Sequence, residues 1–455
     1  MNIVQLTPGA GGMFCGNCFH DNTLVAALRQ LGHDATMLPL YLPINVDEED
    51  QSAGNPIFFG GINVYLEQKS SFFRHAPRWL HGLLNSRRLL EWAAGRAAKT
   101  RSDQVGELLF SMLRGEMGNQ NREITELVAW LRDHAKPEVI CLSNALLIGM
   151  VRRLKTELGV PVVCLLQGEE PYLDSLPDAH RGPVWELMQK RAADVDAWIA
   201  ASRWNAGCMT ARLKLKPGRV QVVHNGIKLD GYRRNKPTPD PSEEGNEQSG
   251  ASGPFPSSEG PGVGSKRRAP VLGYFARMCK DKGLDTLVEA YIHLKNGGRV
   301  PRLKLHIGGG CGPGDEPFVK SLRQRLAAAG YIGEVSFHPN LNHAEKIAFL
   351  QALDVFSVPA RYGEAFGLYL IEAMAAGAPV VQPRTAAFPE IIEATGGGVL
   401  CEPENPKSLS AAIEELLLNP ARALQLGEAG QKAVFERFHA EAMARETLRV
   451  LEGVK

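Results

Sequence analysis

The sequence has no run of about 18 apolar residues, so none of its segments is expected to span a bilayer as a helix. It also lacks a charge bias, because 51 lysines and arginines against 50 aspartates and glutamates leave a formal net charge of +1. That balance gives no indication of nucleic-acid binding. Residues 1–7 lack a basic stretch followed by a long apolar one, so they predict a first strand and not a signal peptide.

A disulfide framework is not expected either, although the chain has eight cysteines. Cys141 and Cys164 lie inside apolar, strand-like runs, which is typical of buried free thiols in a reducing compartment. We therefore expect a cytoplasmic protein. Cys15 and Cys18 form a single Cys-x-x-Cys pair, which is either a loop that merely contains thiols or a weak indication of metal or redox chemistry.

The pattern of apolar segments predicts an α/β protein. With 455 residues, of which 44% are hydrophobic and 22% charged, the chain is long enough for two or three domains. Short apolar runs alternate with helix-like segments in both halves, which favours two Rossmann-like domains with parallel sheets facing a cleft. The expected strands are 2–6, 35–40, 139–142, 160–165, 197–201 and 220–224 in the first half, then 271–275, 303–307, 335–337, 354–358 and 379–381 in the second.

The expected domains are 1–232 and 269–435, separated by an inserted linker. Of the 34 residues from 235 to 268, 18 are proline, glycine or serine, and Phe255 is the single aromatic residue. Such a composition cannot bury enough apolar surface to fold, so the segment predicts a disordered linker without chemistry.

A basic insertion is expected in the first domain at about 69–125. Its residues 69–101 contain eight lysines and arginines against one acid, Glu91, with phenylalanines and tryptophans between them. From Leu80 onward the apolar positions keep helical spacing. Two interpretations remain open: a helical insertion that packs on the domain with a solvated basic face, or an amphipathic helix on an anionic membrane surface.

The most informative motif lies at residues 362–381, after an expected strand. Gly367 opens an expected helix, so backbone N–H groups of Phe366, Gly367 and Leu368 are placed to bind an anion such as a diphosphate. Glu372 lies one to two turns into that helix and is suited to accept hydrogen bonds from ribose hydroxyls. Glu364 lies in the loop and is placed to contact a transferred sugar.

Two further elements follow expected strands in the same half. Arg277 and Lys282 lie in a polar loop after 271–275, where two cations could neutralise the charge on a leaving nucleoside diphosphate. Gly308 and Gly309 end the next strand and allow close backbone approach to a phosphate. Each element alone is ambiguous, but together and in this order they indicate a nucleotide-sugar site.

These residues resemble glycosyltransferase family 4, which has the GT-B architecture. The resemblance covers most of the chain and is strongest over residues 271–400. Glu364 and Glu372 match the family's Glu-x7-Glu motif, while Arg277 and Lys282 match the two cations that hold the donor diphosphate.

The resemblance extends into the first half of the chain. Asn225 and Gly226 match the family's turn after the last strand of the N-terminal domain, and Gly11 and Gly12 match its N-terminal glycine loop, which contacts the donor. The helix expected at 440–451, within a closing segment 436–455, matches the one that returns to the N-terminal domain.

The family resemblance implies retaining transfer from a nucleoside-diphosphate sugar, without a metal or another cofactor. Arg277 and Lys282 would then be catalytic together with Glu364. The leaving phosphate would take the acceptor proton. Asp194 and Asp196 have the spacing of a metal-binding Asp-x-Asp loop, but they precede an expected strand and are interpreted as a helix-end feature.

The chain departs from the family where a histidine usually faces the sugar. The matching stretches, 142–144 and 166–169, contain none. Gln167 could supply a hydrogen bond instead, and His20 is a second candidate, so both are expected contacts of the sugar or the acceptor together with Asn225. In the family's Gly-Gly-x-Pro-Glu segment the chain keeps Pro389 and Glu390.

Three functions therefore remain to be distinguished. The first is an active glycosyltransferase with a sugar, lipid-linked or small-molecule acceptor, and the joint presence of Arg277, Lys282, Glu364 and Glu372 favours it. The second is a non-catalytic subunit that binds a nucleotide or a partner. The third is a GT-B enzyme of another reaction, such as an epimerase or a phosphorylase. The nucleotide base is expected near 337–341.

Vesicle binding distinguishes the two interpretations of residues 69–101. If they form a peripheral membrane helix at the inner face of the membrane, deleting them abolishes co-sedimentation with anionic vesicles, because the basic face provides the electrostatic attraction. Pelleting with phosphatidylserine vesicles measures this. Unchanged pelleting of the deletion variant contradicts the membrane interpretation.

Overall fold

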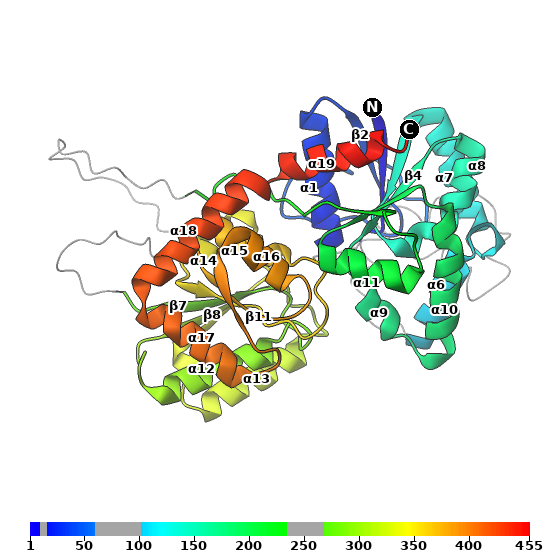
Figure 1. The fold of residues 1–455 in the computed structure, drawn as a ribbon. Helices are drawn as coiled ribbons and strands as arrows, with labels where there is room; N and C mark the ends of the chain where they lie inside the picture. Colours follow the sequence, from blue (N-terminus) through cyan, green and yellow to red (C-terminus); the bar gives the residue numbers. More distant parts are fainter. Residues whose placement is uncertain (10–15, 60–101, 234–267) are drawn as a thin grey trace, which may run out of the picture. The chain divides into compact units, whose positions relative to one another are not determined.

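The computed structural model describes residues 1–9, 16–59, 102–233 and 268–455. Within these ranges the chain forms two compact units. The first comprises Met1–Lys228, Tyr362–Leu368 and Arg437–Lys455, and the second comprises Leu229–Arg361 and Tyr369–Glu436. Each unit contains one parallel sheet, as the alternating pattern predicts (Figure 1).

The first unit is built on a six-stranded sheet with the order β2-β1-β3-β4-β5-β6 among its described residues. Each neighbouring pair runs parallel. The strands are β1 (Asn2–Thr7), β2 (Asp34–Pro39), β3 (Val139–Leu142), β4 (Val162–Leu166), β5 (Ala197–Ala200) and β6 (Val220–Val222). The helices are α1 (Gly16–Gln30), α6 (Ser102–Leu113), α7 (Asn121–Trp130), α8 (Val151–Leu158), α9 (Glu170–Asp174), α10 (Asp178–Arg191), α11 (Arg203–Leu213) and α19 (Ala440–Glu452).

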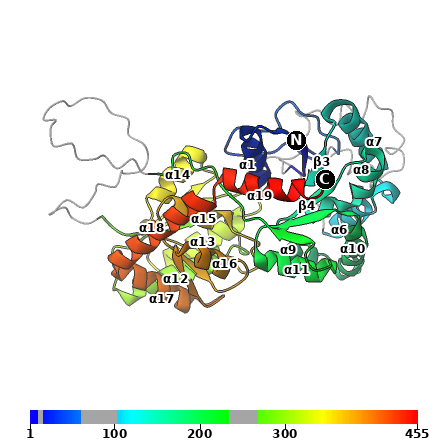
Figure 2. The same cartoon turned by 45° about the horizontal axis from the view of Figure 1, so that its top comes forward.

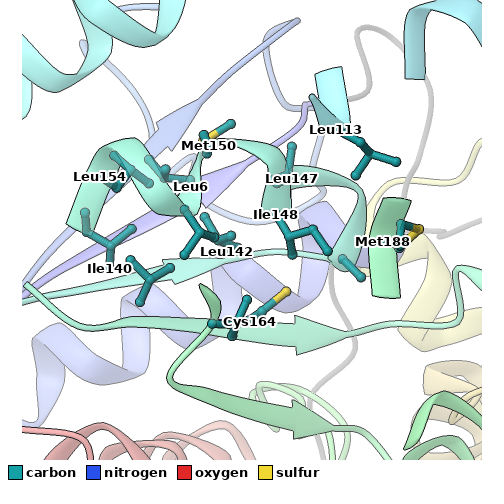
Figure 3. Packing of buried hydrophobic residues seen from close by; sticks show 14 of the residues in the cluster. Leu6, Leu113, Ile140, Leu142, Leu147, Ile148, Met150, Leu154, Cys164 and Met188 are labelled. Carbon is teal, nitrogen blue, oxygen red and sulfur yellow. The ribbon is translucent and has the colours of Figure 1, made fainter. Parts of the chain in front are cut away.

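Apolar side chains fill both faces of this sheet because neighbouring residues of a strand point to opposite sides. In β3, Ile140 and Leu142 belong to one core cluster, whereas Val139 and Cys141 belong to the other. Figure 3 shows the first cluster, where these strand residues meet the helical residues Leu147, Leu154 and Met188. The strands are therefore buried on both sides, as their continuous apolar runs predict.

Helix α19 completes the opposite face of the same sheet. It lies beside α1 in both views (Figures 1 and 2), and Met443, Leu448 and Leu451 join the second core cluster. The helix is attached by a parallel bridge between Ile227 and His439. The last residues of the chain are thus part of the unit that begins at Met1.

The second unit contains another six-stranded parallel sheet, with the order β12-β11-β10-β7-β8-β9 among its described residues. The strands are β7 (Val271–Phe275), β8 (Lys304–Gly309), β9 (Val335–Pro339), β10 (Val355–Phe356), β11 (Val380–Pro383) and β12 (Gly398–Cys401). The helices are α12 (Leu284–Gly297), α13 (Glu316–Ala328), α14 (His343–Gln351), α15 (Leu368–Ala375), α16 (Phe388–Thr395), α17 (Pro406–Leu418) and α18 (Pro420–Arg437). Short helical turns elsewhere in the chain are Gly115–Met117, Leu131–Ala135, Ala145–Met150, Ala192–Asp194 and Ile332–Glu334.

The structure agrees with most expected strands, but it adds one strand and shortens another. β12 was not predicted, because it is a short edge strand with glycines before it and only Cys401 fully buried. β10 is shorter than the expected 354–358, and Asp354, just before it, accepts through its carboxylate from the backbone N–H of Val271 at 2.7 Å. No described helix is both long and apolar enough to cross a membrane.

The expected insertion and linker fall mostly outside the described residues. This applies to 69–101 and to 235–267, and also to Gly11, Gly12 and Cys15. The second part of the expected insertion, from residue 102, is helical in α6 and α7. Cys141, Cys164, Cys208, Cys279, Cys311 and Cys401 are free thiols.

The two histidines His306 and His338 make the second unit sensitive to acid. Their rings lie 5.6 Å apart on β8 and β9, both against Phe349 of α14. Burial and the neighbouring His338 lower the pKa of His306 from 6.5 to about 4. The unfolded chain therefore binds a proton between those values while the folded chain does not, and stability is lost as the pH falls through this window.

We expect His306→Phe to weaken this loss, because phenylalanine keeps an aromatic ring against Phe349 without a titratable nitrogen. Urea unfolding at pH 7.5 and pH 5 measures it, with the exposed His134→Asn as control. A variant whose stability falls with acid as steeply as that of the wild type contradicts the assignment.

Candidate functional site

The second unit has a topological switch point between β7 and β10. The chain leaves β7 through α12 toward β8, and leaves β10 through α15 toward β11 on the other side. At such a point the loops that follow the two strands separate and leave a crevice at the carboxyl ends, where ligands of open α/β sheets bind. Arg277 and Lys282 lie in the first of these loops.

Arg277 is held in place while most of its side chain stays accessible. Its guanidinium donates to both carboxylate oxygens of Asp315, with distances of 3.0–3.2 Å. The Arg277 side chain is 61% exposed and that of Asp315 is 9% exposed. The hydrogen bonds to Asp315 raise the pKa of Arg277, so it remains a fixed cation. The sequence pattern did not identify Asp315, which lies 38 positions away.

The loop backbone around Arg277 is fixed from two sides. The buried Tyr274 donates its hydroxyl to the Arg277 carbonyl at 2.8 Å. The Met278 N–H donates to the Gly310 carbonyl, also at 2.8 Å. The loop after β7 is thereby tied to the loop after β8.

Lys282 lies next to the switch point and is oriented by an aromatic ring. Its ammonium group is 5.2 Å from the ring centroid of Tyr369, in the first turn of α15. The following residue, Gly283, has φ +70°, and a Cβ there would lie 1.9 Å from the Pro359 carbonyl oxygen. The Arg361 N–H donates to the Asp281 carbonyl at 3.0 Å. The loops after β7 and β10 are therefore in backbone contact beside Lys282.

Close packing requires glycine at positions 308 and 309, which the sequence alone did not show. A Cβ at Gly309, where φ is +117°, would lie 2.1 Å from the Ala276 carbonyl oxygen. One at Gly308 would lie 2.7 Å from the Phe275 ring. Next to these glycines, the side-chain oxygen of Asn340 accepts from the Cys311 N–H at 3.1 Å. These glycines let strand ends approach each other, whether or not a phosphate also approaches them.

Glu372 is paired with a lysine that the motif did not reveal. Lys346 of α14 donates to one Glu372 carboxylate oxygen at 2.9 Å, and the two side chains are 9% and 16% exposed respectively. This pairing holds the carboxylate in one orientation. Its other oxygen forms no hydrogen bond with the described residues.

The segment Tyr362–Leu368 carries the first glutamate of the motif and belongs to the first unit. Glu364 accepts from the Tyr362 hydroxyl at 3.2 Å. Ala365 is anchored because its carbonyl accepts from the buried Ser202 hydroxyl at 2.7 Å. Phe366 is only 2% exposed and packs near His224, so its ring is not available to a ligand.

Gly367 and Leu368 end this segment. Gly367 has φ +87°, a conformation that favours glycine, and Leu368 is the first residue of α15. The helix therefore begins directly after the left-handed residue, as the motif predicts.

His20 is part of a buried hydrogen-bonded chain at the start of α1. Its Nδ1 lies 3.0 Å from one Asp21 carboxylate oxygen, and the other oxygen accepts from the Thr7 hydroxyl at 2.7 Å. His20 is 4% exposed and Asp21 is fully buried. The histidine is thus oriented by Asp21 at the carboxyl end of β1, next to β3, where the order of the first sheet switches.

Gln167 and Asn225 follow β4 and β6. The Gln167 N–H donates to the Glu169 carboxylate at 3.2 Å, and that carboxylate also accepts from the Ala145 N–H at 2.8 Å. Burial raises the pKa of Glu169 to about 7. Asn225 is 3% exposed, and its side-chain oxygen has no partner among the described residues.

Close packing also requires glycine in the turn at Gly226. A Cβ at this position would lie 2.3 Å from the His439 carbonyl oxygen, so glycine lets the chain approach the segment that leads into α19.

The two aspartates of the Asp-x-Asp sequence, Asp194 and Asp196, form ion pairs with nearby residues. Asp194 pairs with Arg152 at 3.1 Å, and Asp196 pairs with Lys155 at 2.7 Å and accepts from the Val162 N–H. Both carboxylates are therefore engaged by neighbouring helices and strands at the amino-terminal side of β5. Gly12, an expected donor contact, lies outside the described residues.

Two family matches cover most of the chain. Residues 105–230 match the family described as Glycosyltransferase Family 4. Residues 261–433 match the family described as Glycosyl transferases group 1. The second range contains the loops after β7 and β10 and both glutamates of the motif.

Curated relatives are about a quarter to a third identical to the chain over the stretches that align with it. A GDP-mannose-dependent alpha-(1-6)-phosphatidylinositol monomannoside mannosyltransferase of Mycobacterium tuberculosis is 28% identical over 40% of the chain and 48% of its own length. A D-inositol 3-phosphate glycosyltransferase of Segniliparus rotundus is 28% identical over 67% of the chain and 60% of its own length. The chain thus spans only about half the length of the curated relatives that it matches.

Solved structures share the fold across the whole chain. Sucrose-phosphate synthase from Thermosynechococcus elongatus has a TM-score of 0.68 at 18% identity and covers 99% of the chain, with 98% of its own length matched. Anabaena Alr3699/HepE in complex with UDP and glucose has a TM-score of 0.66 at 15% identity, with 99% of each chain matched. The two-sheet architecture is therefore that of these proteins.

We expect Lys346→Met to lower the free energy of unfolding by about 3 kcal/mol, because it leaves the Glu372 carboxylate buried without its cation. Urea unfolding measures the change. The double variant Lys346→Met with Glu372→Gln should recover most of the loss, since the buried charge is then absent. Equal losses in the single and double variants contradict this account.

Proposed function

Because the chain belongs to glycosyltransferase family 4 and has the GT-B fold, we propose that it transfers a sugar from a nucleoside-diphosphate sugar to a hydroxyl acceptor, retaining the anomeric configuration. The observation that carries this proposal is the pair Arg277 and Lys282 at the switch point of the second unit. Both cations are fixed by their surroundings, Arg277 by Asp315 and Lys282 near Tyr369.

Arg277 and Lys282 would bind the diphosphate of the donor. Two fixed cations in a preorganised loop stabilise the negative charge that grows on the leaving group, without reorganising during the reaction. The backbone N–H groups of 366–368 and the start of α15 would bind the same anion. Gly12, Gly308 and Gly309 would leave room beside it.

The two glutamates of the motif would bind the two ends of the donor. Glu372, with one oxygen held by Lys346, would accept from ribose hydroxyls with the other. Glu364 would accept from hydroxyls of the transferred sugar. His20, oriented by Asp21, and Gln167 are the proposed contacts on the acceptor side, together with Asn225.

In the proposed reaction the bond between the anomeric carbon and the diphosphate oxygen breaks while positive charge develops on the sugar. The acceptor oxygen attacks from the face that the diphosphate leaves, and its proton passes to a leaving phosphate oxygen. Arg277 and Lys282 carry the electrostatic stabilisation, so no metal or other cofactor is required in this scheme.

The donor to test first is GDP-mannose, because one relative is named for its dependence on it. UDP-glucose is the second, since a structural neighbour was solved with UDP and glucose. The relatives named for inositol phosphate and phosphatidylinositol support a cyclitol or a lipid-linked acceptor. The buried free thiols Cys141, Cys164 and Cys401 support a reducing, cytoplasmic location.

We expect one nucleoside diphosphate, from a panel of GDP, UDP and ADP, to raise the unfolding temperature of the wild type, because a ligand that binds the folded state stabilises it. Lys282→Ala should lose most of that shift and lower the transfer rate by about 100-fold, the effect of removing one stabilising group at developing charge. Thermal shift and calorimetry measure binding, and the anomeric proton signal of the product measures retention.

Lys320→Ala, at an exposed position of α13, is the matched control and should behave as the wild type. If the wild type responds neither to a nucleotide in the panel nor to the corresponding nucleotide sugar, this result would instead support a non-catalytic subunit.

A further inference from the structure

The glutamate proposed to contact the transferred sugar lies in a segment that is fixed on both sides of it. Glu364 is partly exposed, whereas Ala365 and Phe366 directly after it are buried. The Tyr362 hydroxyl donates to the Glu364 carboxylate at 3.2 Å, so the side chain is oriented from within its own segment. The position of this carboxylate therefore depends on what holds the backbone of the segment.

Two side chains at the start of α11 hold that backbone. The hydroxyl of the fully buried Ser202 donates to the Ala365 carbonyl at 2.7 Å. Trp204 packs against Gly363, because a Cβ at this glycine would lie 2.3 Å from the indole ring. The two contacts therefore fall on the residues directly before and directly after Glu364.

The Ser202 hydroxyl also begins the helix. Ser202 is the N-cap of α11, and its side chain accepts from the Asn205 N–H at 3.1 Å. A hydroxyl group can donate and accept at the same time. One oxygen atom thus fixes the first turn of α11 and the segment with Glu364 relative to each other.

The two glutamates of the motif are held by different units. The segment Tyr362–Leu368, with Glu364, belongs to the first unit, whereas Glu372, Arg277 and Lys282 belong to the second. The proposed contact of the sugar and the proposed contacts of the diphosphate therefore depend on separate sets of supporting side chains. A change at the start of α11 can alter the first without altering the second.

We propose that Ser202 and Trp204 are positioning residues for Glu364, and that they set the affinity for the sugar moiety of the donor. The inference rests on the glycosyl transfer proposed above. Neither residue needs to touch the donor, because each acts through the backbone next to Glu364. The affinity for the diphosphate is set separately by Arg277 and Lys282.

Ser202→Ala tests this role by measuring the two parts of the donor separately. We expect the variant to bind the nucleoside diphosphate as the wild type does, because the diphosphate contacts belong to the second unit. We expect it to bind the corresponding nucleotide sugar about tenfold more weakly, the effect of losing one hydrogen bond to a charged group. Calorimetric titrations with GDP and GDP-mannose, and with UDP and UDP-glucose, measure the dissociation constants.

Asn405→Ala is the matched control, because Asn405 is the N-cap of α17 and accepts from the N–H groups of Lys407 and Ser408. Both variants should lower the unfolding temperature through the loss of a cap. Only Ser202→Ala should change the ratio of the two dissociation constants. If Ser202→Ala weakens nucleotide and nucleotide sugar equally, its effect is a general loss of structure and the inference is wrong.

Gly363→Ala tests the second contact without removing the cap of α11. The three atoms that a Cβ would meet at Gly363 all belong to the six-membered ring of Trp204. We expect the same selective loss of nucleotide-sugar affinity, because the segment must move away from the ring. The double variant Gly363→Ala with Trp204→Phe should regain most of it, since phenylalanine does not extend as far as those atoms.

A double variant that binds the nucleotide sugar as weakly as Gly363→Ala contradicts the role of Trp204. This pair of variants also decides the inference if Ser202→Ala does not fold.

The nucleotide response of the wild type separates this inference from the proposed function. If the wild type binds a nucleoside diphosphate, and both single variants bind its nucleotide sugar as well as the wild type, the positioning role is refuted and the donor site stands. The same holds if the wild type binds a nucleoside diphosphate but no nucleotide sugar. A wild type that binds neither kind of ligand refutes both proposals.

Discussion

Close contact between three strand ends of the second unit is the constraint on which its candidate site depends. The loop after β7 touches the Pro359 carbonyl at Gly283, and the end of β8 touches the Ala276 carbonyl at Gly309. A side chain at either position would force the backbones apart. The loop that carries Arg277 and Lys282 is therefore fixed by its neighbours before any ligand binds. Electrostatic stabilisation is effective when charges are preorganised in this way.

Most of the architecture was predictable from the sequence, because parallel strands buried on both faces leave continuous apolar runs. The start of α15 was also predictable, since Gly367 precedes an apolar helical stretch. The edge strand β12 was not, because an edge needs few buried residues and therefore leaves a weak pattern.

The candidate site was predictable only in part. Residues that follow strands, such as Arg277 and Lys282, are visible because strand ends meet at one edge of the sheet. Their partners are not visible, since Asp315 and Lys346 come from helices whose distance in sequence says nothing about contact. The glycines at 308 and 309 were interpreted through phosphate chemistry alone, whereas the structure adds a steric reason. Contacts between distant segments require the fold itself.

The bridge between Ile227 and His439, and the packing of α19 on α1, have a consequence for the order of synthesis. The ribosome releases the six strands of the first sheet before it makes the helix that covers one of its faces. Met443 and Leu451 reach that face only when almost the whole chain has emerged. Throughout synthesis of the second unit, apolar residues of α1 remain uncovered and exposed to aggregation or to a chaperone. The first unit to be translated is thus the last to be completed.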